Sequence, residues 1–448
     1  MEIKNKKISI IGAARSGIGA AKLALKFGAI PFVSDSGSEE KLSKSVDALK
    51  NLNIEYEISQ HSSRVYDCDL MVVSPGVPSD AEVIKNAKTK KIKVVSELEF
   101  ASWFCKGTVI GITGTNGKTT TTSLCGYLFN ECGVKTYVAG NIGLAFSEIA
   151  DQVNENEFVS LEISSFQLDL IDKFAPKVAM ILNITPDHLN RYENSVEKYA
   201  LSKQLIYKNQ TEKDFLILGN DSELLTQHLH EHKSQTYWFS TKQKVSNGCW
   251  LDNDRVVFSE NNVEQFSCKV SDIFIRGEHN IQNAMAVIIA AKIFDFDNAK
   301  IVNALQTFKG VEHRLEFVKE IEGIKFINDS KATNIDSVIV ALKSFDEPIF
   351  LILGGLDKGN DYSTIEDLVI QKVKKIYAIG SSAEKIFNYF HNKVKTEIRK
   401  DLDEVVASAL SEARSGDVVL LSPACASFDM FENYEHRGRV FKEIVNKI

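Results

Sequence analysis

The chain has 448 residues, of which 44% are hydrophobic and 25% are charged. This composition is typical of a globular protein, and the length exceeds what one hydrophobic core usually supports, so we expect two or three domains. The net charge of -7 disfavours a general nucleic-acid-binding protein, because neutralising phosphates requires an excess of lysine and arginine.

No stretch of the sequence is apolar for long enough to span a membrane, and the first residues lack the apolar segment of a signal peptide. We therefore expect a cytoplasmic protein that binds neither membrane nor nucleic acid. The seven cysteines are scattered without a CxxC pair, which disfavours a disulfide framework and a thiolate zinc site.

The first part of the chain alternates short apolar segments with segments of helical length. This alternation is typical of βαβ units around a parallel sheet and predicts a Rossmann-like domain over residues 1–104. The expected strands cover residues 6–12, 30–35, 70–76 and 93–97.

The alternation restarts twice further along. A central domain with a mainly parallel sheet is predicted over 105–310, and a second Rossmann-like domain over 311–448, so the fold class is α/β with three domains. A polar, strand-like region over 236–275 precedes an apolar helix over 280–294. The other expected strands cover 108–114, 136–140, 158–164, 178–185, 215–219, 325–330, 348–355, 374–380 and 417–424.

The segment GITGTNGKTTTT, residues 111–122, lies between an expected strand and an expected helix. Its glycines and the Lys118-Thr119 pair are typical of a phosphate-binding loop, in which backbone N–H groups converge on an anion at a helix N-terminus. Lys118 would reach the β and γ phosphates of a nucleotide, and Thr119 would bind Mg²⁺. The pattern departs from GxxxxGK[ST], because Ile112 stands at the first glycine position. A threonine-rich helix cap is the alternative, and the strand–loop–helix context favours phosphate binding.

Three further residues of the central domain are candidates for the site. Glu162 ends one strand and is followed by two serines, which suits either a Mg²⁺ ligand or a helix-capping glutamate. His188 follows another strand, at the edge where open α/β sheets bind ligands, although a lone histidine is usually structural. Lys203 lies on the next expected helix and, taken alone, is one solvated lysine among many.

The segment IIGAARSGIG near the N-terminus is similar to a dinucleotide-binding fingerprint. Ala14 stands where the second glycine should let the backbone approach a pyrophosphate, so a conventional NAD site is disfavoured. Asp35 ends the next strand, about where an acid that binds a ribose would fall.

The segment GTNGKTT resembles the Mur ligase family of ATP-dependent, amide-forming enzymes. Further similar segments occur in the family's order and spacing over more than 300 residues, which makes the set far more specific than any single one. They are GNIG at 140, LEISSFQL at 161, NITPDHLNRY at 183, GEHNIQNA at 277, EHRLEF at 312, INDSKATN at 327, LGGLDKG at 353 and LSPACASFDMFENYEHRG at 421.

The resemblance implies an enzyme of cytoplasmic peptidoglycan precursor synthesis that joins D-glutamate to UDP-N-acetylmuramoyl-L-alanine. It implies that ATP and two Mg²⁺ ions are used, that the reaction passes through an acyl phosphate, and that the protein is a monomer. The implied catalytic residues are Lys118, Glu162, His188 and Lys203. The family's counterpart of Lys203 is carbamylated, which turns a cation into an anion that can bridge to Mg²⁺.

The same resemblance assigns binding residues to each ligand. The implied ATP-binding residues are Gly114, Thr115, Asn116, Gly117, Lys118, Thr119, Thr120, Asn280, His313, Arg314, Asp329 and Lys331. Those for the UDP substrate are Arg15, Ser16, Asp35, Ser36, Ser74, Asn141 and His188. Those for D-glutamate are Thr333, Lys358, Ser427 and Tyr434, the last in place of an expected phenylalanine. The implied metal ligands are Thr119, Glu162, His188 and Lys203.

Three other functions are compatible with part of the sequence. A related ligase that adds L-alanine or a diamino acid is disfavoured by INDSKATN and by the lack of a DNPR-type segment. Folylpolyglutamate synthetase would share the phosphate loop and would not need the first domain. A regulatory nucleotide-binding protein without ligase activity is disfavoured because Lys118, Glu162, His188 and Lys203 are all present.

Overall fold

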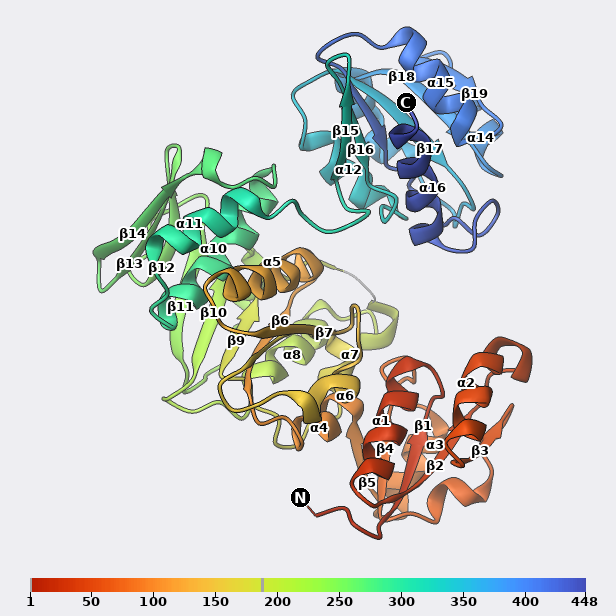
Figure 1. Cartoon of the computed structure of the whole chain (residues 1–448), viewed down its shortest axis with the longest axis vertical. Coiled ribbons are helices and arrows are strands. Elements are labelled where there is room, and N and C mark those ends of the chain that lie inside the picture. Colours follow the sequence, from red (N-terminus) through yellow and green to blue (C-terminus); the bar gives the residue numbers. More distant parts are fainter. Residues whose placement is uncertain (1, 187–188) are drawn as a thin grey trace. The chain divides into compact units, whose positions relative to one another are not determined.

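The computed structural model describes residues 2–186 and 189–448 (Figure 1). The chain divides into two compact units, one comprising Met1–Ile273 with His279–Phe308 and the other Phe274–Glu278 with Lys309–Ile448. The first unit holds two β-sheets and the second holds one, and helices accompany each sheet, which confirms the predicted α/β fold class. Among the described residues, no helix combines the length and the apolar character that a membrane crossing requires.

The N-terminal sheet is parallel throughout, with the strand order β3-β2-β1-β4-β5. The order reverses between β1 and β4, and ligands bind at such a switch point in open α/β sheets. The strands are β1 (Lys7–Ile11), β2 (Ile30–Asp35), β3 (Glu55–Ile58), β4 (Leu70–Val73) and β5 (Lys93–Ser96). The helices are α1 (Arg15–Lys26), α2 (Glu39–Asn51), α3 (Glu82–Thr89) and α4 (Glu97–Ser102), with a 3-10 turn at Ser63–Tyr66.

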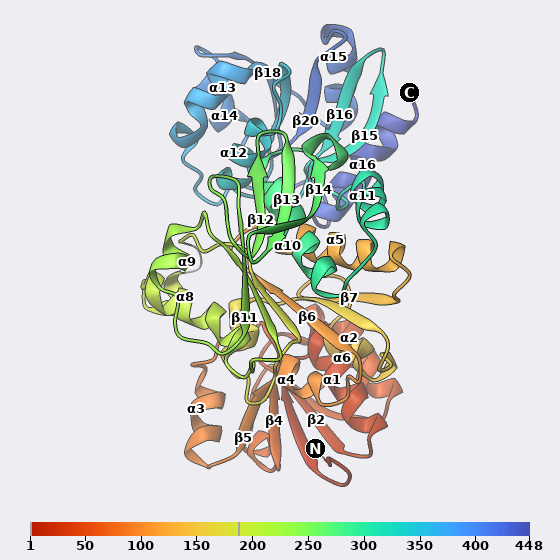
Figure 2. The same ribbon diagram turned by 90° about the vertical axis from the view of Figure 1, so that its left-hand side faces the viewer.

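The central sheet has the order β14-β13-β12-β11-β10-β9-β6-β8-β7 and is parallel from β7 to β12. The last three strands pair antiparallel and extend one edge, as Figure 2 shows. The strands are β6 (Thr108–Thr113), β7 (Thr136–Gly140), β8 (Phe158–Glu162), β9 (Val178–Ile181), β10 (Phe215–Gly219), β11 (Gln235–Ser240), β12 (Gly248–Asp252), β13 (Arg255–Glu260) and β14 (Val263–Lys269).

Helices cover both faces of this sheet. The longest, α10, is buried continuously from Ala284 to Ala291 because its sequence is apolar on every side, as expected for a helix inside a core. The helices are α5 (Lys118–Glu131), α6 (Phe146–Ile149), α7 (Ser165–Leu168), α8 (Val196–Gln204), α9 (Glu223–Gln227), α10 (Glu278–Ile293) and α11 (Asn298–Thr307). Short 3-10 turns lie at Ala150–Gln152, Leu189–Tyr192, Leu205–Tyr207 and Val270–Asp272.

The third sheet has the order β15-β16-β20-β17-β18-β19, and only the edge strand β15 runs antiparallel to its neighbour. The strands are β15 (Glu316–Ile321), β16 (Ile324–Asn328), β17 (Ile349–Gly354), β18 (Val373–Ile379), β19 (Lys395–Ile398) and β20 (Val418–Leu421). The helices are α12 (Ile335–Lys343), α13 (Glu366–Lys372), α14 (Ala383–Phe390), α15 (Leu402–Glu412) and α16 (Tyr434–Asn446), with a 3-10 turn at Tyr362–Ile365.

A buried carboxylate ties the two sheets of the first unit together. Glu99, on α4, is fully buried, and one of its oxygens accepts hydrogen bonds from the backbone N–H groups of Asp172, Lys173 and Phe174 at 2.8–3.0 Å. Its other oxygen accepts a hydrogen bond from the Trp103 indole. A buried carboxylate is stable only when it is hydrogen-bonded in this way. Glu99 therefore anchors the segment that connects the first sheet to the second.

Candidate functional site

The phosphate loop connects β6 to α5 as the sequence predicts. Gly114 and Gly117 have positive φ angles of 150° and 85°, which side-chain-bearing residues rarely adopt. A Cβ atom on Gly117 would also lie 2.4 Å from the Oδ1 atom of Asn283. The loop is braced from the end of β9, since Asn183 accepts hydrogen bonds from the backbone of Thr115 and Asn116 at 3.0 and 2.9 Å. The N-terminus of α5 is thereby held at the end of the sheet, where it can bind an anion.

Two lysines meet at this loop. The Nζ atoms of Lys118 and Lys203 each donate a hydrogen bond of 2.9 Å to the Gly114 carbonyl, and Lys118 also donates to the Thr115 carbonyl at 2.8 Å. Lys203 is only 1% exposed, so it is not the solvated lysine that its sequence alone suggests. Two cationic groups and a helix N-terminus in one place favour the binding of a phosphate.

Glu162 ends β8, and its backbone pairs with that of Ile112 on β6. The side chain is 2% exposed. Its Oε1 atom accepts a hydrogen bond of 3.0 Å from Asn141, whereas Oε2 is buried and has no hydrogen-bond partner among the described residues. An unpaired buried carboxylate oxygen is costly, and a bound Mg²⁺ would satisfy it. Glu162 and the nearly buried Thr119 therefore have the chemistry that a Mg²⁺ site requires.

Two cavities adjoin each other in the first unit, with volumes of about 640 and 440 Å³, in the range of ligand sites. They share Pro75, Gly76 and Asn141. The larger one lies at the switch point of the N-terminal sheet, and its lining includes the residues predicted to contact the UDP substrate, namely Arg15, Ser16, Asp35, Ser36, Ser74 and Asn141. The smaller one is lined by Lys118 and Lys203.

Asp35 also shapes the larger cavity. Its two carboxylate oxygens accept hydrogen bonds from the backbone of Ala13 and Gly37 at 2.6 and 2.7 Å, which draws the loop after β1 toward the end of β2. Ser74 donates a hydrogen bond of 3.1 Å to the Gly12 carbonyl and draws the loop after β4 to the same place. The predicted residues thus build the cavity wall as well as face it.

Arg191 was not predicted as a site residue. Its guanidinium lies 4.0 Å from the centre of the Phe166 ring and donates a hydrogen bond of 3.3 Å to the Gly76 carbonyl. It lines the smaller cavity with the two lysines, so this cavity presents three cationic side chains. Arg191 lies in NITPDHLNRY, one of the segments that carry the family resemblance, and this position could have indicated it as a site residue. The predictions for His188 fall outside the described residues.

Asn280 is buried in the first unit and accepts a hydrogen bond of 3.1 Å from Asn283. Asn283 in turn accepts one from Thr121 on the first turns of α5. Asn280 is thereby linked to the phosphate loop through one intervening side chain.

The predicted ATP residues of the second unit lie together. The backbone of Leu315 donates to Asp329 at 3.2 Å, and that of Lys331 donates to the His313 carbonyl at 3.0 Å. Between them, Arg314 has a buried Nε atom without a hydrogen-bond partner among the described residues. His313 and Leu315 have positive φ angles of 64° and 45°, and such backbone conformations cost on the order of 1–3 kcal/mol each.

The residues predicted for D-glutamate lie on loops that are joined to one another. The loop that carries Lys358 is bonded to the loop that carries Ser427, through the backbone of Leu356 and Ala426 at 2.8 and 3.2 Å. Ser427 is buried and Lys358 is exposed. Thr333 follows the Lys331 loop, and its backbone N–H donates to the Lys331 carbonyl at 2.9 Å.

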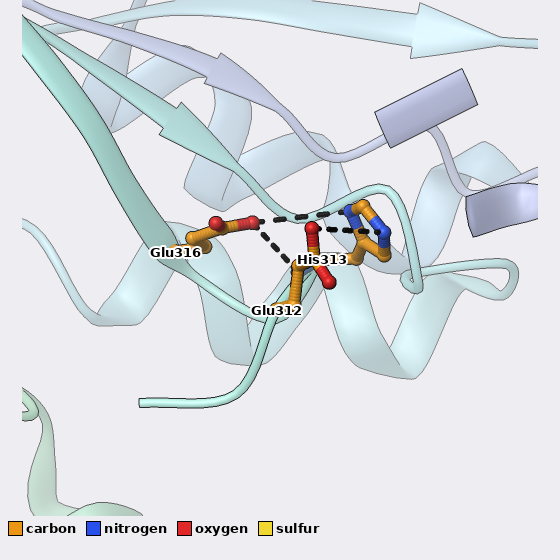
Figure 3. Close-up of side chains that lie close together, drawn as sticks. All are labelled: Glu312, His313 and Glu316. Atoms are coloured by element: carbon orange, nitrogen blue, oxygen red, sulfur yellow. Dashed lines mark hydrogen bonds and ion pairs between the residues drawn. The ribbon is translucent and has the colours of Figure 1, made fainter. Parts of the chain in front are cut away.

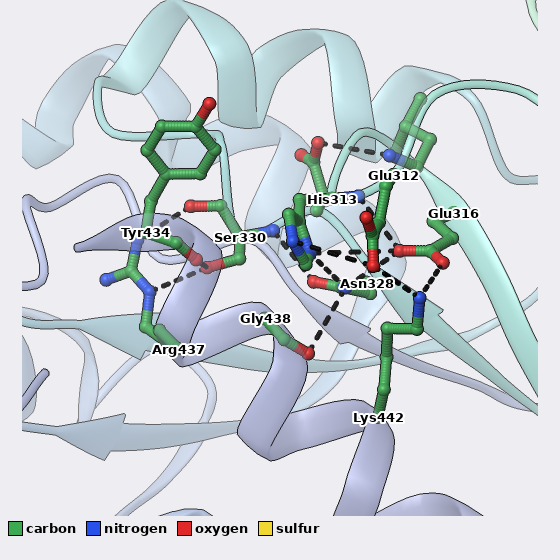
Figure 4. A network of polar contacts seen from close by, with 11 residues as sticks. Glu312, His313, Glu316, Asn328, Ser330, Tyr434, Arg437, Gly438 and Lys442 are labelled. Atoms are coloured by element: carbon green, nitrogen blue, oxygen red, sulfur yellow. Dashed lines mark hydrogen bonds and ion pairs between the residues drawn. The ribbon is translucent and has the colours of Figure 1, made fainter. Parts of the chain in front are cut away.

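Arg437 ties these loops together and was also not predicted. It is 1% exposed and donates a hydrogen bond of 2.7 Å to the Ser330 carbonyl (Figure 4). It also donates one of 3.1 Å to the Cys425 carbonyl. Ser330 also donates a hydrogen bond of 2.8 Å to the carbonyl of Tyr434, at the start of α16. One buried guanidinium thus connects the loops of Lys331 and Ser427 to the helix of Tyr434.

A phosphate loop beside a buried carboxylate, and a second cavity at a Rossmann-type switch point, define a nucleotide-binding α/β protein of several sheets. Models of protein families match three regions of the chain. They are the MurD N-terminal domain over residues 7–83, the Mur ligase middle domain over 112–291 and the Mur ligase, glutamate ligase domain over 313–425. The chain belongs to the Mur ligase family, whose members depend on ATP.

Relatives match over the whole chain. A UDP-N-acetylmuramoylalanine--D-glutamate ligase from Koribacter versatilis is 43% identical over 100% of this chain and 99% of its own. Proteins of the same name from Christiangramia forsetii and Clostridioides difficile are 44% and 42% identical, each over at least 99% of both chains. Among solved structures, the UDP-N-acetylmuramate-alanine ligase MurC from Thermotoga maritima has a TM-score of 0.62 and 21% identity over 99% of both chains. This similarity to a solved structure shows that the fold is shared.

Asp329 should make the stability of the second unit depend on pH. Burial raises the pKa of its carboxyl from 3.8 to about 7. Between these two values the folded state holds a proton that the unfolded state has lost, so the free energy of unfolding should fall as the pH rises through this window and level off above it. Asp329→Asn cannot ionise and should remove this part of the slope. Urea unfolding of both proteins between pH 4.5 and 8 measures it, and equal slopes would contradict the assignment.

Proposed function

We propose that the chain is a ligase that uses ATP to join D-glutamate to UDP-N-acetylmuramoyl-L-alanine in peptidoglycan synthesis. The observation that carries the proposal is the pair of adjoining cavities, because it places the phosphate-loop lysines at one end of the site predicted for the UDP substrate. The names and full-length similarity of the relatives support the choice of D-glutamate. We place the reaction in the cytoplasm and expect the protein to act as a monomer.

The proposal assigns one ligand to each predicted domain. Residues 1–104 would bind the UDP substrate, 105–310 would bind ATP and 311–448 would bind D-glutamate. The uridine nucleotide would occupy the larger cavity, with its free carboxylate in the smaller one, near Lys118, Arg191 and Lys203. The cationic side chains of Lys118 and Arg191 suit a site that must hold a carboxylate beside a nucleotide phosphate.

In the first step, the carboxylate oxygen attacks the γ-phosphorus of ATP, the bond from that phosphorus to the ADP oxygen breaks, and an acyl phosphate forms. Lys118 stabilises the charge on the transferring group. Arg314 of the second unit is suited to stabilise the same charge. Its guanidinium has a buried Nε atom that lacks a hydrogen-bond partner among the described residues.

In the second step, the amine of D-glutamate attacks the acyl carbon, an amide bond forms, and phosphate leaves as the nitrogen loses its proton. Lys358 would pair with the side-chain carboxylate of the amino acid, and Thr333 and Ser427 would donate hydrogen bonds. An acyl phosphate hydrolyses in water, so we expect the second unit to cover the site during the reaction.

Glu162 and Thr119 would hold Mg²⁺, with His188 and Lys203 as the further predicted ligands of two ions. Bound Mg²⁺ would neutralise charge on the phosphates. A carbamate on Lys203 would supply oxygen ligands for Mg²⁺, whereas an ammonium group cannot bind a metal because it has no lone pair. The proposal therefore includes carbamylation of Lys203, which lies buried beside the phosphate loop.

Substrate choice tests the proposal directly. The purified protein should release phosphate and form product from UDP-N-acetylmuramoyl-L-alanine, Mg²⁺-ATP and D-glutamate. L-glutamate should be a poor substrate, since inverting the α-carbon cannot keep the amine and both carboxylates on their three partners. Mass spectrometry of the product, with L-alanine and diaminopimelate in parallel, identifies the amino acid. Addition of L-alanine to UDP-N-acetylmuramate instead would refute the proposal.

Variants of Lys203 test its carbamylation. Lys203→Ala should be nearly inactive, and Lys203→Arg should not restore activity, because a guanidinium stays cationic and cannot take up CO₂. Depletion of CO₂ should lower the activity of the unaltered protein. Steady-state rates with and without added bicarbonate measure both effects. An active Lys203→Arg protein would show that only the positive charge matters.

Lys358→Ala tests the predicted amino-acid pocket. A charge-assisted hydrogen bond contributes about 1.5 to 3 kcal/mol, so the KM for D-glutamate should rise roughly ten- to a hundredfold. The KM for ATP should change much less. Lys118→Ala is the contrasting variant, because it should reduce kcat by orders of magnitude with any amino acid. An unchanged KM for D-glutamate in Lys358→Ala would exclude Lys358 from the pocket.

A further inference from the structure

Arg314 lies between two residues in a backbone conformation that few side-chain-bearing residues adopt. The φ angles of His313 and Leu315 are 64° and 45°. Such a conformation persists only where the surrounding structure imposes it. The contacts that impose it therefore decide where the Arg314 side chain is placed.

Two carboxylates hold the backbone on either side of Arg314. Glu316 accepts a hydrogen bond of 2.8 Å from the N–H group of His313, and Asp329 accepts one of 3.2 Å from that of Leu315. Figure 3 shows Glu316 turned back toward His313. Loss of the Glu316 carboxylate would release the left-handed turn before Arg314.

Glu316 is itself fixed from two other elements. Asn328, at the end of β16, donates a hydrogen bond of 3.0 Å to its Oε2 atom. Lys442, on α16, pairs with its Oε1 atom and also with Glu312 at 2.9 Å (Figure 4). We call Glu316, Asn328 and Lys442 the Glu316 network.

The cluster of Glu312, His313 and Glu316 has the composition of a metal site, since its ligand atoms lie within 4.8 Å of one another. The ammonium of Lys442 already pairs with both carboxylates. The Nδ1 atom of His313 already lies 2.9 Å from the amide nitrogen of Asn328, and a Cβ atom on Gly438 would lie 2.2 Å from the same Nδ1. The cluster is therefore an ion-pair network packed around His313.

We propose that Glu316, fixed by Asn328 and Lys442, is a positioning residue that sets the backbone from which Arg314 reaches the nucleotide phosphates. This inference rests on the proposed function, because it takes Arg314 as a phosphate ligand. The Arg314 Nε atom is buried and lacks a hydrogen-bond partner among the described residues, so the protein leaves one donor of this guanidinium unsatisfied. Glu316 acts through the main chain and touches no substrate.

Glu316→Met removes both acceptor oxygens at similar side-chain volume. It should lower kcat/KM for ATP by about ten- to a hundredfold and change the KM for the UDP substrate less than threefold. Glu316→Gln keeps one acceptor for the His313 N–H, so its kcat/KM for ATP should lie between those of the unaltered protein and Glu316→Met. Lys393→Met is the matched control, because it breaks the 2.9 Å pair with Glu366 elsewhere in the second unit and should change neither constant.

A second variant separates positioning from general stability. If Glu316 acts through Arg314, adding Glu316→Met to Arg314→Ala should lower kcat/KM for ATP no further than Arg314→Ala alone. Full additivity of the two losses would overturn the inference. A loss that merely follows the melting temperature, and that Lys393→Met shares, would overturn it too.

The same variants separate this inference from the proposed function. If the unaltered protein does not join D-glutamate, the proposed function fails, and calorimetry of Mg²⁺-ATP binding still measures the role of Glu316. Glu316→Met should then weaken ATP binding about tenfold, with Lys393→Met unchanged. Equal dissociation constants for the unaltered protein and Glu316→Met would overturn the inference.

Discussion

The Gly114 carbonyl is the point on which the nucleotide site depends. It accepts hydrogen bonds from both Lys118 and Lys203, which come from different helices. The loop that presents this carbonyl contains Gly114 and Gly117, both with positive φ angles, and is braced by Asn183. The carbonyls of the loop thus hold the two lysine side chains near one another, at a helix N-terminus that suits a phosphate.

Each unit contains, at its predicted site, a buried polar atom without a hydrogen-bond partner among the described residues. These atoms are the Oε2 atom of Glu162 in the first unit and the Nε atom of Arg314 in the second. Burying such groups costs free energy that folding alone does not recover. Both atoms have the charge that a Mg²⁺-nucleotide complex would satisfy, one as a ligand of the cation and the other as a partner of the phosphates.

The two units support their site residues in different ways. In the first, polar side chains at the ends of parallel strands accept hydrogen bonds from the backbone of neighbouring loops, as Asp35 and Asn183 show. In the second, the side chains of the buried Arg437 and of the partly exposed Glu316 network connect the loops. Where a side chain of a distant helix holds a loop, substitution of that one side chain can change the conformation of the loop without altering a strand.

Much of the fold could be predicted, because interior strands carry continuous apolar runs. The three strands that were missed in the two Rossmann-like domains, β3, β15 and β19, are all sheet edges. No residue of β3 or β15 is buried, and only Thr396 of β19 is, so no apolar pattern distinguishes them from the loops beside them. An edge strand is defined by its hydrogen bonds to a neighbour, which the local sequence does not contain.

The phosphate loop was determined by the sequence itself, since its function needs only glycines, a lysine and a threonine at adjacent positions between a strand and a helix. The resemblance of the longer segments added the ligand assignments. Only the tertiary structure showed that Lys203 is buried on the same carbonyl as Lys118, that Arg191 faces the smaller cavity, and that Lys442 supports Glu316. Glu316 and Lys442 are 126 residues apart, and such pairings arise from packing between elements, which a local pattern does not encode.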